Sequence, residues 1–425
     1  MKLLFVLTFI LSITLLPSRA EESLEGQFAS PSAEARPWVF WHWTNGNVTR
    51  EGITKDLEAM RDVGIGGVIT FRLSGPAWAP PGPLKTGMEN QLPMIRYAAE
   101  EADRLGLHFS LVIDYGYGSG GPHITPELSM QRLYQSETTV QGGRMVRVKL
   151  PKPSLKETMN MELKKAWLRP GASIKPEVLN DIKNVDSYKD IAVFAVPASS
   201  KASIKKLDSF TGLDVKTAPP EFESGRDALP GGACIDLSAA VNEDGELNWQ
   251  APPGNWTVIR LGYGSNFKLT RPSPAPELGL EADRIHPRGL DRHFDHRLKP
   301  VLEALNKDGT LIDSIFIDSW EAGSQNWTLN FAETFKELRG YELQPWLPAL
   351  TGRVVESADK TERFLWDFRQ TISEQMLTHY IDRLEARLEP YGIESFYEPY
   401  GHMCADPLVW AGRGTFPVAE FWSAP

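Results

Sequence analysis

The sequence predicts an α/β protein built on a (β/α) TIM-type barrel, incomplete at the C-terminus and interrupted by a β-sandwich-like insert. Three observations predict this. Apolar, β-branched runs alternate with helical segments in the first and last parts of the chain. Short alternating strands fill the middle. Several apolar runs end in carboxylates, amides and indoles, as parallel strands do at the C-terminal mouth of a barrel.

The first 20 residues read as a secretory signal peptide. Lys2 precedes the apolar run 3–16, and Ser18 and Ala20 offer small residues at the −3 and −1 positions of a cleavage site. The run is too short to cross a bilayer. Residues 21–36 follow as a polar leader. We therefore expect an exported protein, periplasmic or extracellular, without a membrane span.

Residues 37–135 are predicted to form the first part of the barrel. Strands are expected at 38–43, 68–71 and 109–114. Between them, apolar residues recur at helical spacing in 52–63 and 94–105. Strand, helix and parallel strand in succession are typical of right-handed βα units.

Residues 136–265 are predicted to form the β-rich insert. The alternation of apolar and polar residues in 145–150, 191–196, 234–237 and 256–261 indicates strands. Clusters of Pro, Gly, Asn and Asp separate them, and no helices are expected between them. Short strands in this pattern are typical of a sandwich-like fold.

Residues 266–425 are predicted to continue the barrel and to stop short of its end. Strands are expected at 312–317, 395–398 and 418–422, which makes six in total. A barrel of this type needs eight, so the first and sixth strands should be open edges. On this reading the chain is a fragment, and residues 21–425 alone should be aggregation-prone and inactive.

Composition excludes some functions. The formal net charge of −10 argues against nucleic acid, which requires a clustered basic surface. Only two cysteines are present, Cys234 and Cys404, so the chain is not a disulfide scaffold; they either pair or remain free thiols, and free thiols are favoured. The histidines form no zinc-binding pattern.

The chemistry concentrates where predicted strands end. Glu321, Glu398 and Glu420 each follow or lie in one of the last three strands, with an aromatic residue nearby. Glycoside hydrolysis needs two carboxyl groups across the scissile bond, one protonated and one ionised. A structural ion pair is the alternative for any single glutamate. We expect all three to converge on one cleft as catalytic residues.

Residues near the same strand ends are candidates for binding a sugar or a metal ion. Indole rings stack on the apolar faces of sugars, and amides and carboxylates bind their hydroxyl groups. Asp318 and Glu420 are hard oxygen donors that suit Ca²⁺. The predicted substrate-binding residues are Trp41, His42, Asn45, Asp114, Trp320, Asn326 and Tyr400.

Several motifs together resemble glycoside hydrolase family 106, the α-L-rhamnosidases. They run from about Pro37 to the end of the chain. The motifs lie at 41–49, 56–57, 64–67, 118–122, 125–127, 318–321, 323–328, 351–355, 363–367, 398–401 and 420–422.

The resemblance implies a (β/α) barrel with β-rich inserts, inverting hydrolysis, and a calcium ion that helps to hold rhamnose. It makes Glu321 the expected general base and Glu420 a partner in the site or at the metal. Members of the family are much longer, so the general acid is expected to lie beyond Pro425. The expected partner is a rhamnose-containing oligo- or polysaccharide.

Two other functions fit the same residues. One is a non-catalytic carbohydrate-binding fragment or decayed paralogue that keeps the aromatic cleft and has lost the chemistry. The other is a barrel hydrolase of another glycan, because glutamates at strand ends do not identify the sugar. Intact carboxylates at three strand ends favour the enzyme.

Overall fold

The computed structural model describes residues 23–74, 79–115, 118–167, 176–184, 186–200, 228–306, 311–401, 404–419 and 421. The signal-peptide prediction, Glu420 and Trp422 lie outside these residues. The described chain is a mixed α/β fold. Its centre is a six-stranded, all-parallel sheet in the order β1-β2-β3-β12-β13-β14. The strands are β1 (Trp38–Thr44), β2 (Gly67–Leu73), β3 (His108–Val112), β12 (Ser314–Ile317), β13 (Glu394–Tyr397) and β14 (Phe416–Pro417).

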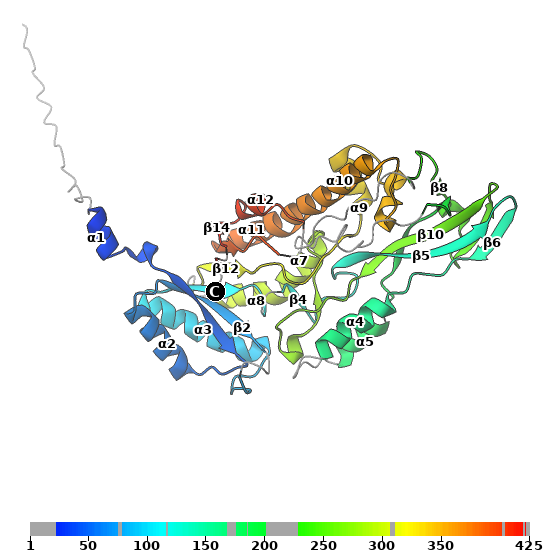
Figure 1. Ribbon diagram of the computed structural model, residues 1–425. Helices are drawn as coiled ribbons and strands as arrows, with labels where there is room; N and C mark the ends of the chain where they lie inside the picture. The colour runs from blue at the N-terminus through cyan, green and yellow to red at the C-terminus, as the bar shows by residue number, and fades with distance from the viewer. Residues whose placement is uncertain are drawn as a thin grey trace, which may run out of the picture.

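Helices cover one face of this sheet, and the largest apolar cluster lies between the two layers. Figure 1 shows α2 and α3 beside the early strands, and α10 and α11 beside the late ones. Leu57 of α2 and Leu384 of α11 are fully buried in that cluster. The helices outside the antiparallel unit are α1 (Leu24–Ala29), α2 (Arg50–Asp62), α3 (Met88–Leu105), α7 (Pro287–His293), α8 (Lys299–Leu305), α9 (Phe331–Arg339), α10 (Ala358–Met376), α11 (Arg383–Leu388) and α12 (Pro407–Ala411).

The opposite face of the sheet is also apolar. Phe71, Val112 and Phe316 lie in neighbouring strands at one level and are buried, and Phe396 packs beside them. Because side chains alternate across a strand, the next inward-pointing positions lie two residues later, at the C-terminal ends of the strands. The sheet therefore presents an aromatic layer with the polar strand ends directly above it.

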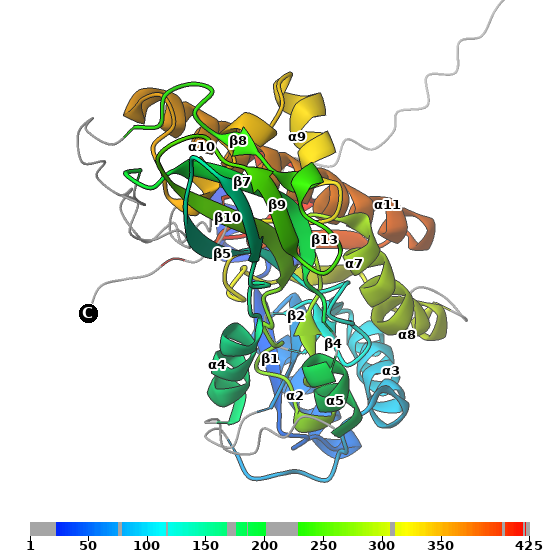
Figure 2. The ribbon, with the colours of Figure 1, turned by 90° about the vertical axis from the view of Figure 1, so that its right-hand side faces the viewer.

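A second unit consists of antiparallel strands that come between β3 and β12 in the chain. A four-stranded sheet, in the order β5-β10-β7-β8, and the pair β6-β9 enclose a separate apolar cluster. Figure 1 shows this unit extending away from the parallel sheet, and Figure 2 views it from its own end. The strands are β5 (Gln131–Gln141), β6 (Met145–Lys149), β7 (Lys189–Pro197), β8 (Ile235–Asp236), β9 (Glu246–Gln250) and β10 (Asn255–Ser265).

The expectation that no helices interrupt these strands was wrong. Helices α4 (Lys156–Trp167) and α5 (Pro176–Asn184) lie between β6 and β7. Met159 and Leu163, four residues apart in α4, pack in one cluster with Val178 and Ile182 of α5. This spacing of apolar residues is the helical signal. It is short enough to be overlooked beside the stronger alternation of the neighbouring strands.

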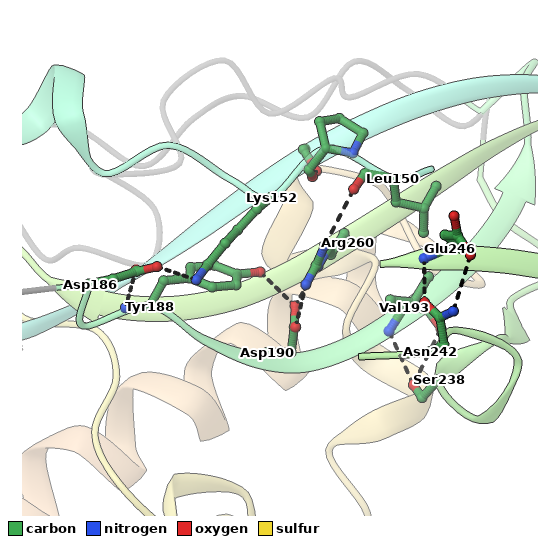
Figure 3. Close-up of polar contacts among 12 residues, drawn as sticks. Leu150, Lys152, Asp186, Tyr188, Asp190, Val193, Ser238, Asn242, Glu246 and Arg260 are labelled. Atoms are coloured by element: carbon green, nitrogen blue, oxygen red, sulfur yellow. Dashed lines mark hydrogen bonds and ion pairs between the residues drawn. The ribbon is translucent and has the colours of Figure 1, made fainter. Parts of the chain in front are cut away.

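Charged and aromatic side chains connect the strands of the antiparallel unit (Figure 3). Arg260 of β10 donates two hydrogen bonds to Asp190 of β7, at 2.8 and 2.7 Å, and the Tyr188 hydroxyl donates to the same carboxylate. Arg260 also donates to the carbonyl oxygen of Leu150, which follows β6. A bidentate Arg–carboxylate pair is geometrically demanding, so these bonds hold β6, β7 and β10 in one arrangement.

The sheet is not closed among the described residues, where β1 and β14 each pair with one neighbour. The sixth strand begins earlier than predicted, at Phe416, because Phe416 and Pro417 are the residues that pair with β13. A short antiparallel pair, β4 (Gly120–Gly121) and β11 (Leu280–Glu281), lies at the edge of the strand-end region. Within the described part of the chain, none of the helices has the length and apolar character needed to cross a membrane.

Packing of α2 on the parallel sheet generates a stability prediction. Leu57 is fully buried, whereas Leu408 of α12 is 84% exposed. We expect Leu57→Ala to lower the free energy of unfolding by about 2–5 kcal/mol, because it leaves a cavity in the core. Leu408→Ala is the matched control and should change it by less than about 0.5 kcal/mol. Urea unfolding followed by circular dichroism measures both, and equal losses would contradict the assigned core.

Candidate active site

The candidate site is built by the parallel pairing of β12 and β13. Ile317 of β12 lies opposite Tyr397 of β13. The residues that follow them, Asp318 and Glu398, therefore also lie side by side. The Glu398 N–H donates to the Ile317 carbonyl oxygen at 3.0 Å, which extends the pairing to this point. Neighbouring strands are separated by about 4.8 Å, so two carboxyl groups meet directly above the aromatic layer.

Hydrogen bonds hold these two carboxyl groups in place. The Ser319 N–H donates to Asp318 Oδ1 at 2.6 Å and to Glu398 Oε2 at 3.2 Å. The Tyr400 hydroxyl donates to the same Glu398 oxygen at 3.1 Å. Both residues are buried: Asp318 is 9% exposed and Glu398 is 5% exposed. The structure therefore brings together Asp318, Glu398 and Tyr400, three of the predicted site residues.

Burial and proximity raise the pKa of Asp318. Loss of solvent is the main cause, and the hydrogen bond and charge of Glu398 add to it, which raises the pKa from 3.8 to about 8. Two carboxylates this close cannot both ionise without repulsion, so the pair holds a proton at neutral pH. A proton or a cation between the two carboxyl groups removes this repulsion.

The loop that follows β12 begins with a buried indole ring. Trp320 is fully buried, its N–H donates to the Tyr400 carbonyl oxygen, and its ring nitrogen donates to that of Gly323. The guanidinium of Arg284 lies 4.2 Å from the centre of the ring, within cation–π range. A ring enclosed in this way anchors the loop. Its position does not support the prediction that Trp320 stacks on a sugar.

The far end of the same loop is held by a buried carboxyl group. Asp283 accepts hydrogen bonds from the Gln325 side-chain amide and the Thr328 hydroxyl, both at 2.5 Å. Burial raises the pKa of Asp283 to about 7, opposed by these hydrogen bonds. Asn326 is also structural, because its side-chain oxygen accepts a hydrogen bond from the Leu133 N–H of β5. These contacts connect the loop to the antiparallel unit.

Glu321 lies within this anchored loop, three residues after Asp318. Its carbonyl oxygen accepts a hydrogen bond of 2.6 Å from Arg271 Nη2. Its side chain is half-buried and has no hydrogen-bond or ion-pair partner among the described residues. A carboxyl group held by its backbone and unpaired at its tip is available to act on a bound molecule.

Arg271 belongs to a crossing segment, residues 266–279, that passes over the strand ends. At β2, the Ser74 N–H donates to the Pro272 carbonyl oxygen. In the loop after β12, the Glu321 carbonyl oxygen accepts a hydrogen bond from Arg271, and the Ser324 carbonyl oxygen accepts one from the Asn266 side chain at 3.2 Å. The segment therefore spans the region that the parallel strands point toward.

Asp114 follows β3 and belongs to a separate charged network. It accepts a hydrogen bond from the Gly120 N–H, and Arg297 Nε lies 3.5 Å from its carboxylate. Arg297 also contacts Glu277 of the crossing segment at 2.6 Å. Burial raises the pKa of Asp114 to about 6, although Arg297 opposes the shift. Asp114 therefore lies among these buried charges, in contact with the segment that crosses the site.

The predicted residues of β1 have other positions. Trp41 is buried against α2, and its ring nitrogen donates to Asp56 at 3.1 Å, so its position gives no support for sugar binding. The Asn45 side chain donates to the Ala79 carbonyl oxygen and accepts from the Ser74 hydroxyl. Asn45 adopts φ 51°, a left-handed conformation that asparagine tolerates, and it shapes the turn after β1.

His42 is exposed on the aromatic face of the sheet, where its ring packs edge-on against Phe71. Partial burial lowers its pKa, so the ring is neutral at pH 7. It stays a candidate for binding a sugar. Glu420 is the second predicted acid of the site and of the metal, and it lies outside the described residues.

The described residues contain no group of three or more His, Cys, Asp or Glu side chains arranged to hold a metal ion. Asp318 and Glu398 are nevertheless hard oxygen donors that carry a shared proton where a cation would fit.

The sequence did not identify Ser319 and Arg271 as residues of the site. A serine after an aspartate and an arginine before a proline are common dipeptides, so only their contacts reveal their roles.

Sequence comparison places the chain among known proteins. The profile of the α-L-rhamnosidases, glycoside hydrolase family 106, matches residues 29–425. The chain belongs to this family. The chain is therefore a member of a glycoside hydrolase family, and the matched region of the chain includes the whole candidate site.

Two relatives extend this comparison. A curated protein of Formosa agariphila, titled "Putative beta-glucuronidase", is 35% identical over 432 residues, 98% of this chain and 34% of that protein. The solved structure of a rhamnosidase from Novosphingobium sp. PP1Y has a TM-score of 0.68 at 22% identity, over 93% of this chain and 49% of that one. The second likeness shows the fold alone. The chain spans about a third of the first relative and half of the second.

The shared proton generates a pH prediction. Because the folded-state pKa of Asp318 is raised, its contribution to stability is present at low pH and is lost as pH rises through about 8. In buffer with a chelator, the free energy of unfolding of the wild type should fall between pH 5 and 9. Asp318→Asn should flatten that part of the profile, as measured by urea unfolding. Parallel profiles for the two proteins would contradict a shared proton.

Proposed function

We propose that the chain forms the sugar-cleaving site of an exported, inverting α-L-rhamnosidase that removes terminal rhamnose from plant or microbial glycans. The convergence of Asp318 and Glu398 beside the loop that carries Glu321 supports this most directly. Family membership supports the reaction class. The predicted signal peptide supports export.

In this proposal Glu321 is the general base. Its carboxyl tip has no partner among the described residues, and Arg271 and Trp320 hold its backbone from either side. An inverting base activates a water molecule on the face of the sugar opposite the leaving group. The acid that protonates the leaving group is a separate carboxyl group about 6.5–9.5 Å from the base.

We further propose that Asp318 and Glu398 hold a calcium ion together with Glu420. Their donor atoms fit, because two carboxyl groups share a proton that a hard cation would replace. The bound ion would supply charge neutralisation and orientation of the sugar hydroxyl groups. Ser319 and Tyr400 donate hydrogen bonds that hold these carboxyl groups in position.

The parallel sheet is proposed to be part of a (β/α) barrel, and the antiparallel unit its insert. Six parallel strands in chain order, with helices on one face, support this arrangement. The aromatic layer would then lie inside the barrel, and the site would lie at its C-terminal mouth. Phe40 of β1 and Phe416 of β14 are about half exposed, as expected of strands that pair with one neighbour each among the described residues.

The role of Glu321 can be tested by substitution in an active protein that contains this chain. Glu321→Gln should lower kcat for an aryl α-L-rhamnoside by about 10²–10⁴-fold, because the amide cannot accept the proton of water. Glu333→Gln, on the surface of α9, is the matched control and should retain activity. The melting temperature of both variants should remain that of the wild type. Near-normal turnover by Glu321→Gln would remove it from the mechanism.

The metal proposal has its own test. A chelator should abolish turnover of the aryl rhamnoside, and Ca²⁺ should restore it better than Mg²⁺, which prefers a smaller octahedral site. Asp318→Asn should raise the Ca²⁺ concentration that restores half of the turnover by at least about tenfold. Turnover that is indifferent to chelation would leave Asp318 and Glu398 without a metal.

A second reaction is favoured by the similarity to the Formosa agariphila protein named "Putative beta-glucuronidase". The third possibility is a carbohydrate-binding protein without catalysis. Aryl α-L-rhamnoside, aryl β-D-glucuronide and direct binding assays separate the three. Hydrolysis of the glucuronide alone would replace the rhamnosidase proposal, and binding without hydrolysis of either would support the non-catalytic function.

A further inference from the structure

The crossing segment places a positive charge beside the candidate site. Arg271 donates through Nη2 to the carbonyl oxygen of Glu321, so its guanidinium lies against the loop that carries the proposed base. One of its five N–H donors is used in this contact. None of its nitrogens is buried without a partner, so the remaining donors reach solvent or a bound molecule.

Three other cations near the strand ends are paired with carboxylates. Lys268 contacts the buried Glu162 at 3.1 Å. Arg284 pairs with Glu281 at 3.1 Å, and both are almost fully buried. Arg297 lies between Asp114 and Glu277.

Arg271 differs from these residues. Among the described residues, no carboxylate lies within ion-pair distance of its guanidinium. It is half-buried, and it is held in place by a backbone contact that leaves its charge uncompensated. A fixed guanidinium with free N–H groups is the group that proteins use for bidentate recognition of carboxylates and other oxyanions.

We propose that Arg271 recognises an anionic substituent, a carboxylate or a sulfate, on a sugar that adjoins the terminal rhamnose in the site next to Glu321. The substrate class is therefore an acidic glycan, such as one that contains a uronic acid. This inference rests on the proposed function for the location of the sugar, because Arg271 marks the same site. The overall charge of −10 makes a local cation necessary for such a substrate.

The test uses three matched ligands: methyl β-D-glucuronide, methyl β-D-glucoside, and methyl β-D-glucoside 6-sulfate. They share one ring and differ only in the substituent at carbon 6. Binding to the protein is measured by NMR titration at low salt. The wild type should bind the glucuronide or the sulfate ester about tenfold more tightly than the glucoside, in proportion to one charge-assisted contact. Whichever anion binds more tightly identifies the source of the charge.

Arg271→Ala should abolish this preference, and Arg271→Lys should restore part of it, because lysine keeps the charge but loses the planar fork. Raising the ionic strength should weaken the preference in the wild type. Arg363→Ala, which removes a surface arginine of α10, is the control and should retain it. A loop that is merely distorted would weaken all three ligands alike and leave their ratio unchanged.

Equal affinity of the wild type for all three ligands would overturn the inference. So would a preference for the anions that persists in Arg271→Ala, or an absence of measurable binding. These readouts need no hydrolysis, so they are independent of the rhamnosidase assay. An enzyme that cleaves aryl rhamnoside and shows no anion preference would keep the proposed function and lose this inference.

Discussion

The in-register pairing of β12 with β13 is the constraint on which the site depends. It sets Asp318 against Glu398 and forces the two carboxyl groups to share a proton. A shift of one residue would turn one of them to the opposite face of the sheet, into the apolar cluster beneath the helices. The aromatic layer below, with Phe316 and Phe396 side by side, opposes such a shift.

Two sets of contacts carry this local arrangement outward. Trp320, enclosed by Arg284 and by the backbone after β13, holds the start of the loop. Asp283, with Gln325 and Thr328, holds its end against the antiparallel unit. Glu321 lies between these anchors. The residues that the sequence predicts to bind sugar are thus of two kinds. Some face the site, and others hold the loop that forms it.

Several features of the site were predictable because they depend on local patterns. Apolar runs that end in carboxylates located β12 and β13, and they indicated that Asp318 and Glu398 lie where these strands end. Burial of Trp41 and Trp320 was not predictable. An indole ring is equally suited to a core and to a sugar surface, and only its neighbours distinguish the two.

The sequence by itself determined the class of fold, the order of its strands and the family, because periodicity and motifs are properties of adjacent residues. It did not reveal helices α4 and α5, whose apolar spacing is short and is completed by contacts with each other. The tertiary structure alone decided which acids meet. Asp318 and Glu398 are 80 positions apart, and only strand register brings them together. It also decided the position of Arg271, because a segment that crosses the strand ends has no local signature.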